Sequence, residues 1–79
     1  MSRQNKSKPE LKGDALKRLN LLQRVGVPDA AALLDMHPYT LREYLSKGYI
    51  ESILIGKRPW ITKHEIERYQ KHGKRDPDK

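Results

Sequence analysis

The spacing of apolar residues changes at Gly48, and this change limits the folds open to the chain. Before Gly48, apolar residues recur every three to five positions, as in helices that bury one face. After it, Ile50, Ser52 and Leu54 alternate with their neighbours at a period of two, as in a strand. The sequence therefore predicts a mostly α-helical fold with a small β-hairpin.

Three helices are predicted before Gly48. An amphipathic helix is expected over about residues 14–24, with Asp14 as its cap and Gly26 as its stop. A short Ala-rich helix follows over about residues 29–34, and a third runs over about residues 38–47. Two short helices joined by a turn of three or four residues form a helix-turn-helix.

A hairpin and a closing helix are predicted after Gly48. The first strand is expected near residues 50–55, the turn at 56–59 and the return strand from Trp60. Thr62 and Glu65 have the spacing of a capping box and start a last helix. Residues 13–72 thus form one domain, between a flexible basic arm at 1–12 and a flexible tail at 73–79.

The charge of the chain favours a partner that carries phosphates. The 79 residues have a net charge of +7 and include no cysteine, which excludes disulfides and cysteine-ligated zinc. Residues 1–26 hold seven basic residues against two acidic ones, so the positive charge is concentrated at the N-terminal flank. The chain has no apolar run long enough for a membrane span, and we expect a cytoplasmic, nucleoid-associated protein.

The order of these elements is similar to the excisionase-type DNA-binding domains of the MerR-like group. The resemblance covers about residues 27–69, and its pieces are Ala30-Ala31-Ala32-Leu33-Leu34, His37-Pro38-Tyr39-Thr40-Leu41-Arg42, Lys47-Gly48-Tyr49-Ile50, Ile55-Gly56-Lys57-Arg58 and Ile61-Thr62-Lys63-His64-Glu65-Ile66-Glu67. It implies a winged helix-turn-helix fold, here with an extra N-terminal helix.

The chain departs from the family pattern at two places. Asp35 stands where the family usually has a glycine in the turn between the two short helices. Pro59 stands where the family has an aromatic residue on the return strand, and Trp60 follows one place later. Because a shift of one residue reverses the face of a strand, Trp60 lies either in the core or on the DNA-facing side.

The resemblance implies sequence-specific binding of double-stranded DNA. An excisionase-like protein bends DNA to direct recombination of a mobile element or prophage, so a recombinase or integrase is a possible partner. We expect a monomer in solution that assembles cooperatively or dimerises on DNA. Alternatives are a small transcriptional repressor with the same domain, a DNA-recognition subunit of a phage packaging machine, and an RNA-binding or adaptor module.

Side chains at the start of the recognition helix are the ones expected to reach DNA, since the major groove admits one helix. Arg42 can donate twice to guanine, and Glu43 can accept from cytosine. Hydroxyls at the helix start suit phosphate oxygens. The recognition-helix candidates are His37, Tyr39, Thr40, Arg42, Glu43 and Lys47.

Structural roles for several of these residues stay open. Glu43 and Lys47 are four residues apart, the spacing of an exposed ion pair on a helix. His37 lies where a cap would be, and Tyr44 shares the inner face of the helix with Leu41.

Two further sets of cations are candidates for contacts to the DNA backbone. Lys57 and Arg58 lie at the tip of the predicted hairpin, where they can enter a minor groove or follow its phosphates. The arm would add sequence-independent phosphate contacts from Arg3, Lys6, Lys8 and Lys12.

The sequence gives no support for catalysis. His64 and His72 are eight residues apart and His37 lies on another element, so no set of metal ligands is complete. The chain has neither a nucleophile motif nor a glycine-rich phosphate loop. We therefore expect no enzyme activity, cofactor or metal.

Overall fold

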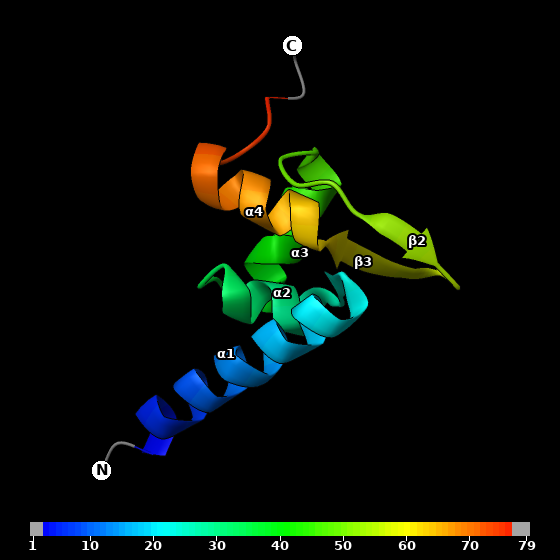
Figure 1. The fold of residues 1–79 in the computed structure, drawn as a ribbon. Helices are drawn as coiled ribbons and strands as arrows, with labels where there is room; N and C mark the ends of the chain where they lie inside the picture. The colour runs from blue at the N-terminus through cyan, green and yellow to red at the C-terminus, as the bar shows by residue number, and fades with distance from the viewer. Residues whose placement is uncertain (1–2, 77–79) are drawn as a thin grey trace.

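A computed structural model describes residues 3–76, with the side chains of residues 12–76, and within that range it contains four helices and a three-stranded antiparallel sheet (Figure 1). The elements are α1 (Arg3–Leu22), β1 (Arg24–Val25), α2 (Val27–Leu33), α3 (Pro38–Lys47), β2 (Ile53–Ile55), β3 (Arg58–Thr62) and α4 (Lys63–His72). The prediction of a mostly helical chain with a small β-hairpin is confirmed.

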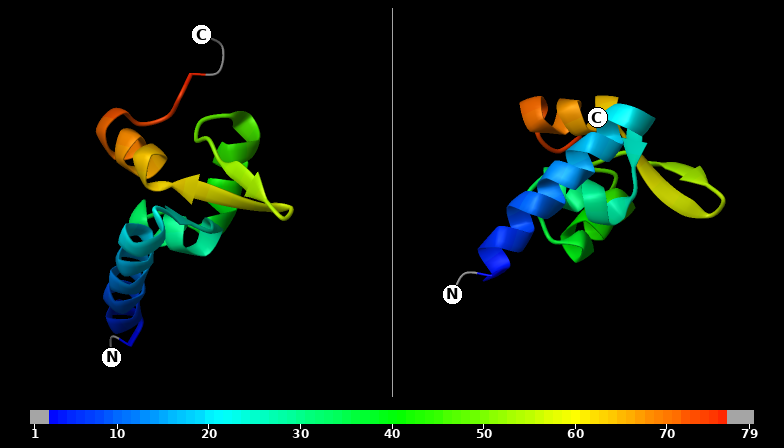
Figure 2. Two further views of the ribbon diagram at one scale, coloured as in Figure 1. Left: turned by 45° about the vertical axis from the view of Figure 1, so that its right-hand side comes forward. Right: turned by 60° about the horizontal axis from the view of Figure 1, so that its bottom comes forward.

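The core lies where the four helices meet the sheet. Strand β3 is central, with β1 on one side and β2 on the other. The buried apolar side chains come from every helix and from β1, β3 and the segment before β2, and they are Ala15, Leu19, Val25, Val27, Ala30, Ala31, Leu33, Leu41, Ile50, Ile61 and Ile66. The hairpin of β2 and β3 extends away from this core in both views of Figure 2.

Helix α1 begins at Arg3, whereas the sequence predicted a start near Asp14 after a flexible arm at residues 1–12. Asp14 is therefore an exposed residue inside the helix and does not cap it. Residues 3–12 lack apolar periodicity and include Pro9, which disfavours a helix interior. Half of them are Lys, Gln or Glu, good helix formers that extend a helix already nucleated. Arg3, Lys6 and Lys8 thus lie on the first turns of α1.

The end of α1 also differs from the prediction. The helix ends at Leu22, Gln23 adopts a left-handed conformation with φ of 65°, and the chain then enters β1. Gly26, predicted to stop α1, is instead the N-cap residue of α2. Pairing of β1 with β3 explains the early end, because the backbone of residues 24–25 bonds to a strand far along the chain.

The turn between α2 and α3 accommodates Asp35 in a position that glycine would occupy easily. Asp35 has φ of 58°, the left-handed conformation that glycine adopts most easily and that Asp tolerates better than most residues. The backbone N–H of Met36 closes the turn by donating to the carbonyl of Ala31 at 2.9 Å. The turn therefore keeps its shape without a glycine.

The hairpin turn is shorter than predicted. Its two central residues are Gly56 and Lys57, both with positive φ, so Arg58 and Pro59 belong to β3 and not to the turn. Pro59 faces Leu54, the pair of the ladder that shares no hydrogen bonds when the turn has two residues. The missing N–H of proline therefore removes no bond to β2.

Helix α4 starts at the predicted cap. The Oγ1 atom of Thr62 accepts a hydrogen bond from the N–H of Glu65 at 3.1 Å. The carboxylate of Glu65 does not return to the Thr62 N–H as in a full capping box, but accepts from the N–H of Glu51 at 2.9 Å.

Residues 73–76, predicted to be part of a flexible tail, pack against the domain. The N–H of Arg75 donates to the carbonyl of Tyr49 at 2.8 Å, and its guanidinium bonds to Glu65. A buried carboxylate that needs cationic partners explains why this segment is held. The rest of the predicted tail, residues 77–79, lies outside the described residues. Across residues 3–76, no helix combines the length and the apolar character that a membrane crossing requires.

Candidate nucleic-acid interface

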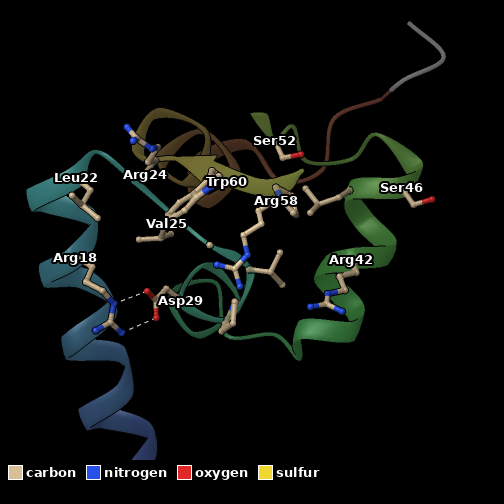
Figure 3. A pocket seen from close by; sticks show the side chains of 15 residues that line it. Arg18, Leu22, Arg24, Val25, Asp29, Arg42, Ser46, Ser52, Arg58 and Trp60 are labelled. Carbon is tan, nitrogen blue, oxygen red and sulfur yellow. Dashed lines mark hydrogen bonds and ion pairs between the residues drawn. The ribbon is translucent and has the colours of Figure 1, made fainter. Parts of the chain in front are cut away.

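A groove of about 760 Å³ lies between α3 and the hairpin and reaches α1 and the start of α2 (Figure 3). It is lined by Arg18 and Leu22 of α1, Arg24 and Val25 of β1, residues 26–29, Arg42, Leu45 and Ser46 of α3, and Ser52, Arg58, Pro59 and Trp60 of the hairpin. Two of the predicted DNA-contacting residues, Arg42 and Arg58, are thus brought together from elements that are separate in the sequence.

One face of α3 is exposed along its whole length. Tyr39, Arg42, Glu43 and Ser46 follow each other at helical spacing on this face, and all four are exposed. Leu41 holds the opposite face in the core, where it is fully buried. The helix can therefore present its polar face without losing its attachment to the domain.

His37 is the N-cap residue of α3. Its Nδ1 atom accepts a hydrogen bond from the backbone N–H of Tyr39 at 3.0 Å, and Pro38 occupies the first helical position. The alternative reading of His37 as a helix cap is thereby confirmed. Tyr39 remains largely exposed, and Thr40 is half-buried.

The ion pair that the spacing of Glu43 and Lys47 allows does not form. Among residues 12–76, whose side chains are described, neither residue has an ion-pair partner. Both side chains are exposed on α3. The structural alternative for these two residues is therefore wrong, and their charges are open to an external partner.

The arginines of residues 12–76 divide into two groups. Three bond to carboxylates: Arg18 to Asp29, and Arg68 and Arg75 to Glu65. The other three have no carboxylate partner within this part of the chain, and they are Arg24, Arg42 and Arg58. All three of these line the groove.

Arg18 and Asp29 form the fixed part of the groove wall. Two side-chain hydrogen bonds of 2.6 and 2.8 Å join the guanidinium to the carboxylate, as the dashed lines in Figure 3 mark. These bonds raise the pKa of Arg18 above its ordinary value. Asp29 is thereby neutralised, which leaves the groove with a positive excess.

Trp60 lies in the groove wall and not in the core. Its neighbour Ile61 is fully buried, and successive residues of a strand point to opposite faces. The guanidinium carbon of Arg24 lies 5.7 Å from the centroid of the Trp60 ring, within the range of a cation–π contact. Trp60 therefore places a large aromatic surface beside a cation.

The predicted cations Lys12, Lys47 and Lys57 do not line the groove. Lys57 occupies the hairpin turn and Lys47 the end of α3. Lys12 forms an ion pair with Asp35 at 2.9 Å, so it does not behave as part of a free arm. The side chains of Arg3, Lys6 and Lys8 lie outside the described side chains.

Sequence reasoning missed the contributions of Arg18 and Arg24 to the groove. Both were visible only as polar residues on the outer face of the predicted helix at 14–24. Arg24 enters the groove because it belongs to β1, a two-residue strand too short to leave a periodic signal. Asp29, four residues after Val25, gave no sign in the sequence that it would face Arg18.

Outside the groove lining, charged groups of α4 and of the segment that follows it neutralise each other. The carboxylate of Glu65, only 4% exposed, accepts hydrogen bonds from Arg68, Arg75 and the N–H of Glu51. Burial alone would raise the pKa of Glu65, but these hydrogen bonds outweigh it and lower the pKa from 4.5 to about 2. Glu65 is thus ionised at neutral pH.

The described residues hold no cluster of three His, Cys, Asp or Glu side chains that could bind a metal ion. His64 and His72 are both exposed on α4. Comparison of the chain with protein-family models, with curated proteins and with solved structures found no match. A functional assignment therefore depends on the geometry and charge of the groove and of α3.

Proposed function

We propose that this chain is a winged helix-turn-helix protein that binds double-stranded DNA, with α3 as the recognition helix and the β2–β3 hairpin as the wing. One observation carries the proposal. The three arginines without a carboxylate partner in residues 12–76 come from β1, α3 and β3, and all line one groove. Unneutralised cations gathered from separate elements are the electrostatic footprint of a phosphate-bearing partner.

The exposed face of α3 supplies the sequence readout in this proposal. Arg42 is the donor to the N7 and O6 atoms of guanine, and Glu43 the acceptor for the amino group of cytosine. Tyr39 and Thr40 contact phosphates at the start of the helix, where backbone N–H groups also favour an anion. His37 acts through its cap, which fixes the first turn that carries these residues.

The flanks of α3 position the DNA. Lys57 and Arg58 contact the backbone or minor groove from the wing, and Arg24 adds a cation beside Trp60. Arg3, Lys6 and Lys8 on the first turns of α1 add contacts that carry no sequence information. The affinity should therefore fall steeply as the salt concentration rises.

Within DNA-binding functions we propose an excisionase-like role in the cytoplasm, in which the protein bends recombination sites for a recombinase. This part rests on the resemblance of residues 27–69 to that family. A map of binding sites in the host genome separates it from a promoter-binding repressor. Sites beside an integrase gene support it, and sites confined to promoters contradict it.

The test of DNA binding is selection from a random pool of duplexes, followed by titration of the recovered sites. We expect one motif to be enriched, and Arg42→Ala to relax the preference at one base pair, which is worth about 1–3 kcal/mol. Lys71→Ala is the matched control, because it removes an exposed cation of α4 that does not line the groove. Failure to enrich any duplex, or equal losses from both variants, would refute the proposal.

A further inference from the structure

Strand β2 lies at the edge of the sheet, and its three side chains are apolar and exposed. Ile53, Leu54 and Ile55 are 45%, 73% and 43% exposed, and β2 pairs only with β3 among the described residues 3–76. An edge strand leaves backbone groups that can pair with another strand, and proteins limit this with charges, prolines or short strands. Strand β2 is short, with three residues. None of the three residues of β2 is charged or a proline.

The register of the hairpin determines which backbone groups face the open edge. With a two-residue turn, Ile55 and Arg58 form a hydrogen-bonded pair, and so do Ile53 and Trp60. The N–H and C=O groups of Ile53 and Ile55 are therefore directed at β3. Those of Leu54 are directed away from β3, at the open edge.

This edge is complementary to itself. If Leu54 of one copy lies opposite Leu54 of a second, antiparallel copy, the two residues can exchange both backbone hydrogen bonds. The same register places Ile53 opposite Ile55 on one face of the extended sheet. The same register directs Glu51 of each copy, which lies 3.4 Å from Arg75 of its own chain, toward the hairpin turn of the other copy. The Lys57 side chain of that turn supplies the opposite charge.

We propose that β2 is a homodimerisation edge, at which a second copy of this chain pairs antiparallel about Leu54. The interface is two-fold symmetric and joins two hairpins into a continuous sheet. Two strands of three residues bury little surface, so the dimer forms at high protein concentration. This proposal does not rest on DNA binding, and it is tested without nucleic acid.

The first test uses the absence of cysteine from the chain. Leu54→Cys can form a disulfide only with a second copy, and a hydrogen-bonded antiparallel pair has a Cα separation of about 5.5 Å, within the range a disulfide spans. We expect oxidative cross-linking at least about tenfold faster than for Leu21→Cys, a control at a more exposed leucine of α1. Equal rates for the two variants would overturn the proposal.

The second test probes the register. Lys57→Glu and Glu51→Lys should each weaken dimerisation, and the double variant should restore it, as measured by sedimentation velocity into the millimolar range. Leu54→Lys should weaken the dimer at least about tenfold, because like charges would lie directly opposite. A wild-type chain that stays monomeric throughout, or a double variant weaker than either single one, would overturn the proposal.

Discussion

The arginines beside α4 and the arginines that line the groove differ in their partners. On the side toward α4, Arg68 and Arg75 both bond to the buried carboxylate of Glu65. On the groove side, Arg42 and Arg58 have no carboxylate partner within residues 12–76. The arginines of residues 12–76 that have no carboxylate partner are therefore gathered at the groove.

This difference separates residues that hold the fold from residues that are free to bind. A buried carboxylate is tolerated only when cations and donors compensate it, so breaking the Glu65 cluster costs stability. An exposed arginine with no partner contributes little to folding, so its removal leaves stability nearly unchanged. Variants on the two sides should therefore change different measurements.

The largest effect is expected from Glu65→Gln. The substitution leaves Arg68 without a carboxylate and leaves Arg75 only the exposed carboxylate of Glu51, at 3.4 Å. We expect the free energy of unfolding to fall by about 3 kcal/mol in urea titrations. Glu67→Gln, at an exposed position of the same helix, should change it by less than about 0.5 kcal/mol. At temperatures where the variant is folded, its DNA affinity should stay within about twofold of the wild type. A large loss of affinity would show that the Glu65 cluster also contributes to binding.

Acid should remove the same stabilisation gradually. The pKa of Glu65 is lowered in the folded protein to about 2 from 4.5, so its contribution is fully present above about pH 4.5 and is lost as the pH falls toward 2. A shift of this size corresponds to about 3 kcal/mol. Unfolding followed from pH 6 to 2 should show this loss in the wild type and a flatter profile in Glu65→Gln. Parallel profiles would assign acid sensitivity to other groups.

The same conservative substitution should have different consequences on the two sides. Arg42→Lys keeps the charge but loses the planar pair of donors, so we expect about 1–3 kcal/mol less discrimination at one base pair with stability unchanged. Arg68→Lys should lower stability with specificity intact, because lysine lacks the planar set of donors with which Arg68 binds both oxygens of Glu65 and the Gly73 carbonyl. Titration of matched and mismatched duplexes and urea unfolding check both. If Arg42→Lys destabilised the fold, Arg42 would contribute to stability as Arg68 does, and the division into stabilising and binding arginines would be wrong.

Elements fixed by local pattern were predictable from the sequence. The apolar spacing located α2, α3 and the hairpin, and Thr62 and Gly48 were correctly assigned as the cap and the end of their helices. The N-terminal extension of α1 was not predicted, because helix propensity leaves no apolar period. The docking of residues 73–76 was not predicted either, because it depends on a carboxylate ten residues away in sequence.

The candidate site was predictable only in part, for the same reason. Arg42 and Arg58 were identified because a helix start and a hairpin tip are local features. Arg24 and the position of Trp60 depend on the pairing of β1 with β3, which joins residues 24–25 to 61–62. Long-range pairing of so short a strand has no signature in the sequence.

The smallest effect is expected at the turn of the β2–β3 hairpin, where Lys57 bears on both stability and binding. Lys57 has φ of 67°, a conformation that costs a non-glycine residue about 1–2 kcal/mol. Lys57→Gly should therefore raise the free energy of unfolding by about 0.5–1 kcal/mol while lowering DNA affinity and reducing the salt slope by about one. Gln23→Gly, with φ of 65°, relieves the same strain outside the groove lining and should leave affinity unchanged. If Lys57→Gly stabilises the fold but weakens DNA binding, the strained lysine is retained for contact with a partner. If the variant gains both stability and affinity, the strain at Lys57 has no role in binding.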